Sequence, residues 1–219
     1  MFDLDGTLVD SLPDLAAALN RVLAEAGLPP HPLDAVARMV GHGVARLVER
    51  GFAAAGEPLD LGALPRWVER FLHFYAEDLS TLSRPFPGAA EALDALAAAG
   101  WRLGVCTNKP TRLAEGLLDA LGLGRRFAAV VGGDAAPERK PHPAPLLVTF
   151  DRLEVPAAAA VFVGDSETDV LTARAAGVPI ALVRHGYAGV PAEALGGDAV
   201  ADDLAALPAL LEALLPAAG

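Results

Sequence analysis

From about residue 88 to the end of the chain, short apolar runs alternate with amphipathic stretches. The apolar runs predict strands at residues 101–106, 128–131, 161–163 and 179–183. Apolar residues at helical spacing predict helices at residues 111–121, 143–153 and 168–176. Strands that alternate with helices indicate a parallel sheet with right-handed crossovers. Met1 and Phe2 can add one very short strand, so we predict an α/β, Rossmann-like core.

Residues 11–82 differ, because they show helical spacing and no strand pattern. Ser11, with an acid three residues later, predicts the N-cap of a first helix, and further helices are expected at residues 44–55 and 64–82. The proline-rich residues 83–88 predict a linker back into the α/β region. We therefore expect three parts, which are core residues 1–11, a helical domain at 12–84 and the α/β core at 85–219. The helical domain is then an insertion after the first strand.

Acidic residues outnumber basic ones by 28 to 17, which gives a formal net charge of −11. Such a chain repels a phosphate backbone and holds no basic run, so we expect no nucleic-acid partner. The longest charge-free apolar runs are about ten residues, too short to cross a bilayer, and the first residues show no signal-peptide pattern. The single cysteine, Cys106, excludes an intramolecular disulfide. These observations predict a cytoplasmic protein with no membrane partner.

Polar side chains follow the apolar runs at the points where the predicted strands end. Ligands of open parallel sheets bind beyond the carboxyl ends of the strands, so these side chains are candidates for a site. The candidates are Asp3, Asp5, Thr107, Asn108, Asp165 and, one helical turn later, Asp169. Clustered carboxylates repel each other and need a cation, and oxygen ligands suit magnesium. Taken singly, Asp165 could merely be the N-cap of the following helix, and Asp169 could be an ordinary acidic residue in its first turn.

These groups fit a phosphoryl transfer. A carboxylate can attack phosphorus in line and form an acyl-phosphate, which splits a difficult hydrolysis into two steps. The leaving alkoxide needs a proton and the second step needs an activated water, and an acid two residues from the nucleophile can serve both. Charge on the phosphoryl oxygens calls for magnesium and a cationic side chain. Lys140, in a loop stiffened by two prolines, is the candidate cation.

Four segments resemble, in order, the motifs of the haloacid-dehalogenase superfamily of phosphatases: residues 3–11 (DLDGTLVDS), 107–110 (TNKP), 140–143 (KPHP) and 164–169 (GDSETD). The resemblance covers nearly the whole chain and implies a parallel-sheet core with an inserted helical cap. Three further segments are similar to those of the phosphoglycolate phosphatases in this superfamily: residues 41–43, 84–88 and 131–134. The implied reaction is magnesium-dependent hydrolysis of a small phosphate monoester, 2-phosphoglycolate above all, through a phosphoaspartate.

The resemblance also implies a role for each motif residue. Asp3 would be the nucleophile, and Asp5 would be the general acid and base. Magnesium would be held by the Asp3 carboxylate, the Asp5 backbone carbonyl and Asp165. The residues that contact the phosphoryl oxygens would be Thr107, Asn108 and Lys140. Asp169 would position Lys140 or a metal-bound water.

Within the helical insertion, Gly41, His42 and Gly43 precede Arg46 by a few residues. Glycines let backbone N–H groups approach an anion, and arginine offers a planar fork to a carboxylate. We expect these four residues to recognise the substrate carboxylate, although a solvated helix residue explains Arg46 equally well. The cap is expected to close over the site by hinging at residues 8–12 and 83–88.

Three alternatives stay open. The substrate can be another small or sugar phosphate, or the scaffold can serve a sugar-phosphate mutase, which retains its phosphoaspartate until the product rebinds. The third alternative is a metal-dependent binding module without activity, although every chemical position is intact. We expect a monomer or homodimer whose partner is a small-molecule phosphate ester.

Overall fold

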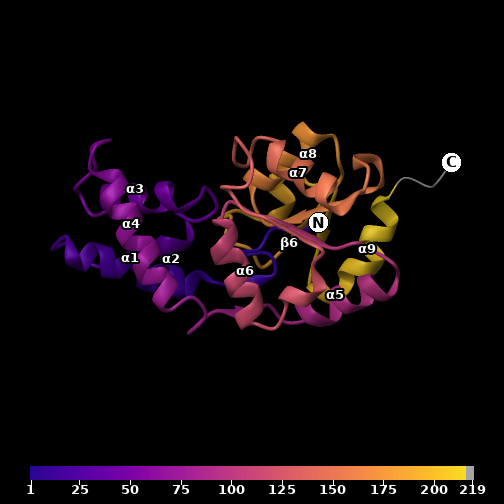
Figure 1. Cartoon of the computed structure of the whole chain (residues 1–219), viewed down its shortest axis with the longest axis horizontal. Coiled ribbons are helices and arrows are strands. Elements are labelled where there is room, and N and C mark those ends of the chain that lie inside the picture. Colours follow the sequence, from indigo (N-terminus) through magenta and orange to yellow (C-terminus); the bar gives the residue numbers. More distant parts are fainter. Residues whose placement is uncertain (216–219) are drawn as a thin grey trace.

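The computed structural model describes residues 1–215 and has a helical part beside an α/β part (Figure 1). The described helices are α1 (Leu12–Glu25), α2 (Leu33–Ala37), α3 (Val44–Ala54), α4 (Leu64–Glu77), α5 (Ala89–Ala98), α6 (Thr111–Ala120), α7 (Ala144–Leu153), α8 (Glu167–Ala176) and α9 (Leu207–Leu214). The described strands are β1 (Val9–Asp10), β2 (Arg84–Pro85), β3 (Gly104–Cys106), β4 (Ala129–Val131), β5 (Phe162–Gly164), β6 (Ile180–Val183) and β7 (Ala199–Ala201). Residues 216–219 of the predicted core lie outside the described residues.

The central sheet is parallel and is completed by the first residues of the chain. β3 pairs with β4, and β6 pairs with β5 on one side and β7 on the other. Phe2 bridges Val105 of β3 and Val163 of β5, which joins the two groups of strands. Its N–H donates to the Gly104 carbonyl at 2.9 Å, and the next N–H donates to the Val163 carbonyl at 2.8 Å. The predicted parallel sheet is confirmed, with the short N-terminal segment at its centre.

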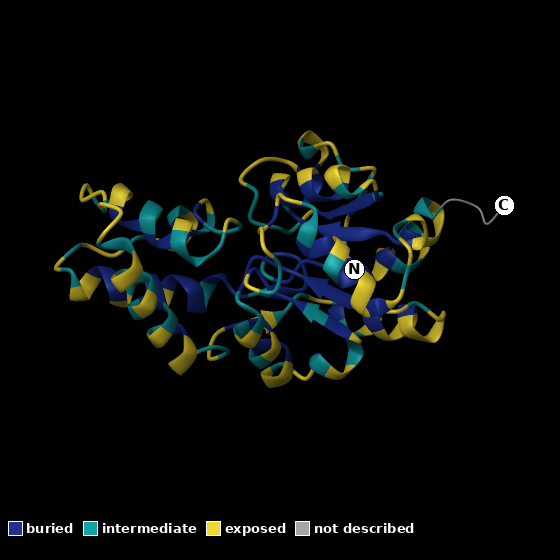
Figure 2. Ribbon diagram, turned by 45° about the horizontal axis from the view of Figure 1, so that its top comes forward, coloured by how far each residue is buried: buried dark blue, intermediate teal, exposed yellow. Residues whose placement is uncertain are grey.

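Side chains of the sheet alternate between two buried faces, because successive residues of a strand point in opposite directions. Phe2, Val105 and Val163 pack into an apolar cluster with α5, α6 and α9. Cys106 and Phe162 pack into a second cluster with α7 and α8. The sheet is therefore a middle layer between two layers of helices, and most of it is dark blue in Figure 2.

Helices α1 to α4 bury an apolar cluster of their own, which includes the fully buried Phe71 and Tyr75. In Figure 1 they form the indigo and purple part, to one side of the sheet. No helix within residues 1–215 is long and apolar enough to cross a membrane.

The last helix of this part is shorter than its apolar pattern predicts. α4 ends at Glu77, so the prediction of helix through residue 82 is wrong for its last residues. At Asp78 the backbone leaves the helical conformation, with φ −126° and ψ 45°. Leu79, which extends the apolar pattern, packs against both the helical cluster and the cluster of α5 and α6. The predicted strand at 101–106 is likewise shorter and begins at Gly104.

The two segments that join the parts pair with each other as the antiparallel strands β1 and β2. The buried Asp14 of α1 lies beside this pair. Its carboxylate accepts hydrogen bonds from the Leu82 N–H at 2.9 Å, the Ser83 N–H at 2.7 Å and the Ser83 hydroxyl at 2.6 Å. The start of α1 is thereby fixed to the second joining segment.

Ser11 occupies the predicted N-cap position of α1, but its side chain makes no capping hydrogen bond. The Ser11 hydroxyl donates to Asp5 Oδ1 at 2.5 Å, and the acid three residues later, Asp14, bonds to the second joining segment instead. Both side chains have tertiary partners that a local capping pattern does not reveal.

Candidate active site

Three buried polar side chains meet where neighbouring strands of the sheet end. Asp3 follows Phe2, Thr107 follows β3, and Asp165 follows β5. Because Phe2 lies between β3 and β5, these side chains adjoin at the carboxyl edge of the sheet. The structure thus brings together the residues that the strand-end argument selects.

Lys140 places a positive charge in this group. Its Nζ lies 3.0 Å from Asp3 Oδ2 and 2.7 Å from Asp169 Oδ1, and its side chain is only 1% exposed. Burial alone would lower the pKa of Lys140, but the carboxylates of Asp169 and Asp3 raise it above its ordinary value. The ammonium therefore stays charged beside Asp3, where a phosphoryl group would need it.

Both carboxylate oxygens of Asp169 are engaged by the protein. Oδ1 accepts from Lys140, and Oδ2 accepts from the Ser166 N–H at 3.1 Å and the Ser166 hydroxyl at 2.6 Å. Asp169 lies in the first turn of α8, so the helix start orients it. These contacts fit a residue that positions Lys140.

Asp3, Asp165 and Asp169 form an acidic cluster whose ligand atoms lie within 4.8 Å of one another. Burial, together with the charges of Asp169 and Asp3, raises the pKa of Asp165 to about 8. Burial also raises the pKa of Asp3 to about 6, against the opposing effect of Lys140. A divalent cation would compensate these buried charges. The oxygens of Asp3 and Asp165 fit a hard cation such as magnesium, while Asp169 is held by Lys140.

Asp165 is held in place by the loop that follows Asp3 and by the segment that follows β6. The Thr7 hydroxyl donates to Oδ1 at 2.9 Å, and the Tyr187 N–H donates to Oδ2 at 2.9 Å. Gly6 has a φ of +85°, and a Cβ there would lie 2.6 Å from Asp165 Oδ2. Glycine is therefore required at this position for both conformation and space. Thr7 and Tyr187 were not among the predicted site residues.

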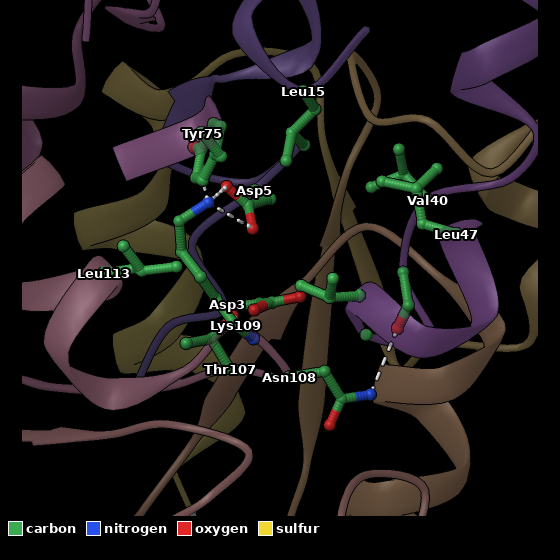
Figure 3. Close-up of a pocket in the computed structure, with 13 residues that line it drawn as sticks. Asp3, Asp5, Leu15, Val40, Leu47, Tyr75, Thr107, Asn108, Lys109 and Leu113 are labelled. Atoms are coloured by element: carbon green, nitrogen blue, oxygen red, sulfur yellow. Dashed lines mark hydrogen bonds and ion pairs between the residues drawn. The ribbon is translucent and has the colours of Figure 1, made fainter. Parts of the chain in front are cut away.

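Asn108 connects the core to the helical part. Its Nδ2 donates to the Lys140 carbonyl at 3.0 Å. It also donates to the Gly41 carbonyl at 3.1 Å, a bond drawn in Figure 3. Its Oδ1 is buried and has no hydrogen-bond partner within residues 1–215. The predicted contact of this side-chain amide with phosphoryl oxygens therefore requires an exchange of its present bonds.

Two cavities border Asp3 and Asp5. The smaller has a volume of about 40 Å³ and apolar walls from both parts of the molecule (Figure 3). These walls include Leu15, Val40, Leu47 and Leu113. The larger, of about 420 Å³, lies on the side of Asp165. A phosphoryl group at Asp3 would border both cavities.

Lys109 is a site residue that the sequence argument missed. Its ammonium lies 2.9 Å from Asp5 Oδ1 and 2.7 Å from the Tyr75 hydroxyl, and its side chain is 2% exposed (Figure 3). Burial alone would lower the pKa of Lys109, but Asp5 and Tyr75 raise it above its ordinary value. The chain has only two lysines, Lys109 and Lys140, and both are buried here. The small number of lysines is a sequence signal from which Lys109 could have been identified as a candidate.

The turn of the helical part reaches the site, but its arginine does not. Gly41 and Gly43 have φ values of 103° and 83°, which favour glycine, and both line the smaller cavity. His42 lines the larger cavity. Arg46 is exposed and pairs with Glu49 at 2.5 Å. Arg46 therefore lines neither of the two cavities that border Asp3.

A family model of the haloacid dehalogenase-like hydrolases matches residues 1–183. The chain belongs to this family. The membership predicted from the four motifs is thereby confirmed, and the matched residues include all four motifs.

Curated relatives of this haloacid dehalogenase-like hydrolase are similar over most of its length. It is 50% identical to a phosphoglycolate phosphatase of Caulobacter vibrioides, over 91% of this chain and 84% of that protein. It is 51% identical to a phosphoglycolate phosphatase of Rhodospirillum rubrum, over 94% of this chain and 88% of that protein. The fold agrees as well. The crystal structure of a predicted phosphoglycolate phosphatase from Haemophilus somnus 129PT superposes with a TM-score of 0.89 at 35% identity, covering 96% of both chains.

Proposed function

We propose that this hydrolase is a magnesium-dependent phosphatase that acts on 2-phosphoglycolate, with Asp3 as its nucleophile. The observation that carries the proposal is the position of Asp3, 3.0 Å from the Lys140 ammonium and in one cluster with Asp165. A carboxylate held in this way can attack phosphorus while positive charge surrounds the transferring group.

In the first step, an oxygen of Asp3 forms a bond to phosphorus as the bond to the glycolate oxygen breaks, which gives a phosphoaspartate and an alkoxide. Asp5, when it carries a proton, gives that proton to the alkoxide. Lys140 neutralises charge on the phosphoryl oxygens, with Thr107 and Asn108 as further contacts.

In the second step, Asp5 takes a proton from a water molecule whose oxygen forms a bond to phosphorus, and the bond to Asp3 breaks. Inorganic phosphate leaves, Asp3 is again a carboxylate, and Asp5 again carries its proton. A magnesium ion held by Asp3, Asp165 and the Asp5 carbonyl would supply further charge neutralisation. A helical cap formed by residues 12–84 would exclude bulk water during these steps, with hinges at residues 8–12 and 83–88.

The choice of 2-phosphoglycolate as the substrate rests on the two relatives named phosphoglycolate phosphatase, which are 50% and 51% identical to this chain. The smaller cavity supports it, because about 40 Å³ gives room for about three water-sized groups, which suits a leaving group of a few heavy atoms. The larger cavity, about 420 Å³, has room for a sugar, so a hexose phosphate belongs in the test. The expected cytoplasmic location and the monomeric or homodimeric state stay predictions.

The test is a phosphate-release assay on 2-phosphoglycolate, ethyl phosphate and a hexose phosphate, each with and without magnesium. We expect the fastest release from 2-phosphoglycolate and none after chelation of the metal. A faster reaction of the hexose phosphate would contradict the substrate assignment. Formation of an isomerised sugar without free phosphate would instead identify a mutase.

A further inference from the structure

Lys109 lines the smaller of the two cavities that border Asp3. It lines this cavity together with Asp3 (Figure 3), so a substrate that has its phosphorus at Asp3 and its leaving group in this cavity extends toward Lys109. Of the cavity-lining residues within 1–215, Lys109 is the one cation, and the rest of the wall is largely apolar. The larger cavity offers Arg38 and His42 instead, but Arg38 is 62% exposed and paired with Asp34.

We propose that Lys109 determines substrate specificity by binding the carboxylate of the substrate, an inference that rests on the proposed function. A buried ammonium in an apolar wall binds a carboxylate more strongly than an exposed arginine does, because water does not screen the contact. The carboxylate of 2-phosphoglycolate can thus pair with the Lys109 ammonium. Ethyl phosphate is of similar size but has a methyl group in place of the carboxylate.

The present contacts of Lys109 indicate how binding proceeds. Without substrate, its ammonium is satisfied by Asp5 Oδ1 at 2.9 Å, Asp5 Oδ2 at 3.2 Å and the Tyr75 hydroxyl at 2.7 Å. Asp5 must turn toward the leaving oxygen to give it a proton, and a buried ammonium left without an anion is costly. A substrate carboxylate takes the place of Asp5 on Lys109 and so offsets that cost. An ester without a carboxylate leaves Lys109 and Asp5 paired.

Tyr75 connects Lys109, on which the substrate carboxylate would replace Asp5, to the helical part. It lies on α4, whereas Lys109 and Asp5 belong to the α/β part, so the three side chains join the two parts at the cavity. The Tyr75 hydroxyl can keep its bond to Lys109 while the carboxylate partner changes.

The first test compares kcat/KM for 2-phosphoglycolate with kcat/KM for ethyl phosphate in the parent and in Lys109→Met. The ratio of the two values cancels any effect of the substitution that both substrates share. We expect the ratio to fall by at least about thirtyfold, as for loss of one partner of a buried charged contact. The matched control is Arg112→Met, which removes the same charge from an exposed position on α6 and should leave the ratio unchanged.

The second test leaves Lys109 intact and serves also if Lys109→Met does not fold. Lysine labelled with ¹³C at Cε gives two side-chain NMR signals, because the chain has two lysines, and Lys109→Arg assigns them. The Asp3→Asn variant with magnesium is titrated to saturation with each ester. We expect 2-phosphoglycolate to shift the Lys109 signal more than ethyl phosphate does.

Equal shifts with both esters, or a Lys109→Met enzyme that keeps the parental ratio, would overturn the role of Lys109. A parent enzyme without any preference for 2-phosphoglycolate would refute the proposed function, and the inference with it. The two failures are therefore distinguishable.

Discussion

The Lys140 ammonium lies 3.0 Å from Asp3 Oδ2, and both side chains are buried. Lys140 reaches this position from the loop before α7, whereas Asp3 follows the central segment of the sheet. The contact fixes the direction of the Asp3 carboxylate and brings positive charge to the face on which phosphorus would approach.

Asp169→Asn should weaken the placement of Lys140, because it removes one of the two carboxylates that hold the ammonium. We expect a loss of about 3 kcal/mol in the free energy of unfolding and a decrease of about a hundredfold in kcat. Denaturant unfolding and phosphate release measure the two effects. Asp202→Asn, at an exposed carboxylate, is the control and should change neither. A fully active Asp169→Asn enzyme would remove Asp169 from the positioning of Lys140.

Without metal, the protein should lose stability as the pH rises. The pKa of Asp3 is about 6 and that of Asp165 about 8 in the folded state, both above the ordinary 3.8, so the folded state binds these protons more tightly than the unfolded chain does. Their ionisation therefore opposes folding from about pH 4 upward, and the loss is complete above about pH 8. Thermal unfolding of the metal-free protein across this range measures the effect.

Magnesium should stabilise the protein more at about pH 8 than at about pH 5, because the cation binds the ionised carboxylates. Asp165→Asn should raise the melting temperature of the metal-free protein at the higher pH. It should also abolish most of the increase in melting temperature that magnesium causes. An increase in melting temperature with magnesium that is independent of pH would argue against this metal site. So would an increase that remains in Asp165→Asn.

Asp14→Ala should loosen the connection between the two parts of the molecule. Its carboxylate accepts hydrogen bonds from two N–H groups and one hydroxyl of Leu82 and Ser83, and all three would lose their partner. We expect a loss of about 3 kcal/mol in the free energy of unfolding and faster proteolysis near residue 82. Asp78→Ala, at an exposed carboxylate, should change stability by less than about 0.5 kcal/mol. Equal effects of the two substitutions would contradict the assignment.

Asp3→Asn should reduce turnover by at least about a thousandfold, because an amide does not attack phosphorus. The fold should remain, since asparagine fills nearly the same space, and circular dichroism checks this. Activity within about tenfold of the parent would exclude Asp3 as the nucleophile.

Much of the sheet and of the acidic cluster could be predicted from the sequence. The strands are short apolar runs, and the polar residues that follow them must lie at one edge when the strands are parallel. Asp3, Thr107 and Asp165 are placed together for this reason. The contact of Asp169 with Lys140 is one of the two roles that the family resemblance implied for this residue, the other being a contact with a metal-bound water.

Other features depend on tertiary contacts that no local pattern contains. Ser11 has the sequence of a helix cap, yet its hydroxyl bonds to Asp5 because the turn after Asp3 brings the two together. Lys109 looks like a surface residue of a loop, yet Tyr75 and Asp5 surround it once the helical part packs on the core. Arg46, which was expected at the site, projects to solvent because its helix presents that face outward.

The most direct measurement of the central claim is a rapid acid quench of the parent enzyme during its first turnover of 2-phosphoglycolate with magnesium. Acid preserves an acyl-phosphate long enough for peptide mass spectrometry, and cleavage after Arg21 releases the peptide that contains Asp3. The account predicts that this peptide gains the mass of one phosphoryl group at Asp3 and loses it as inorganic phosphate forms. Phosphate released from an enzyme that never carries the group, or carries it on another residue, would contradict the account.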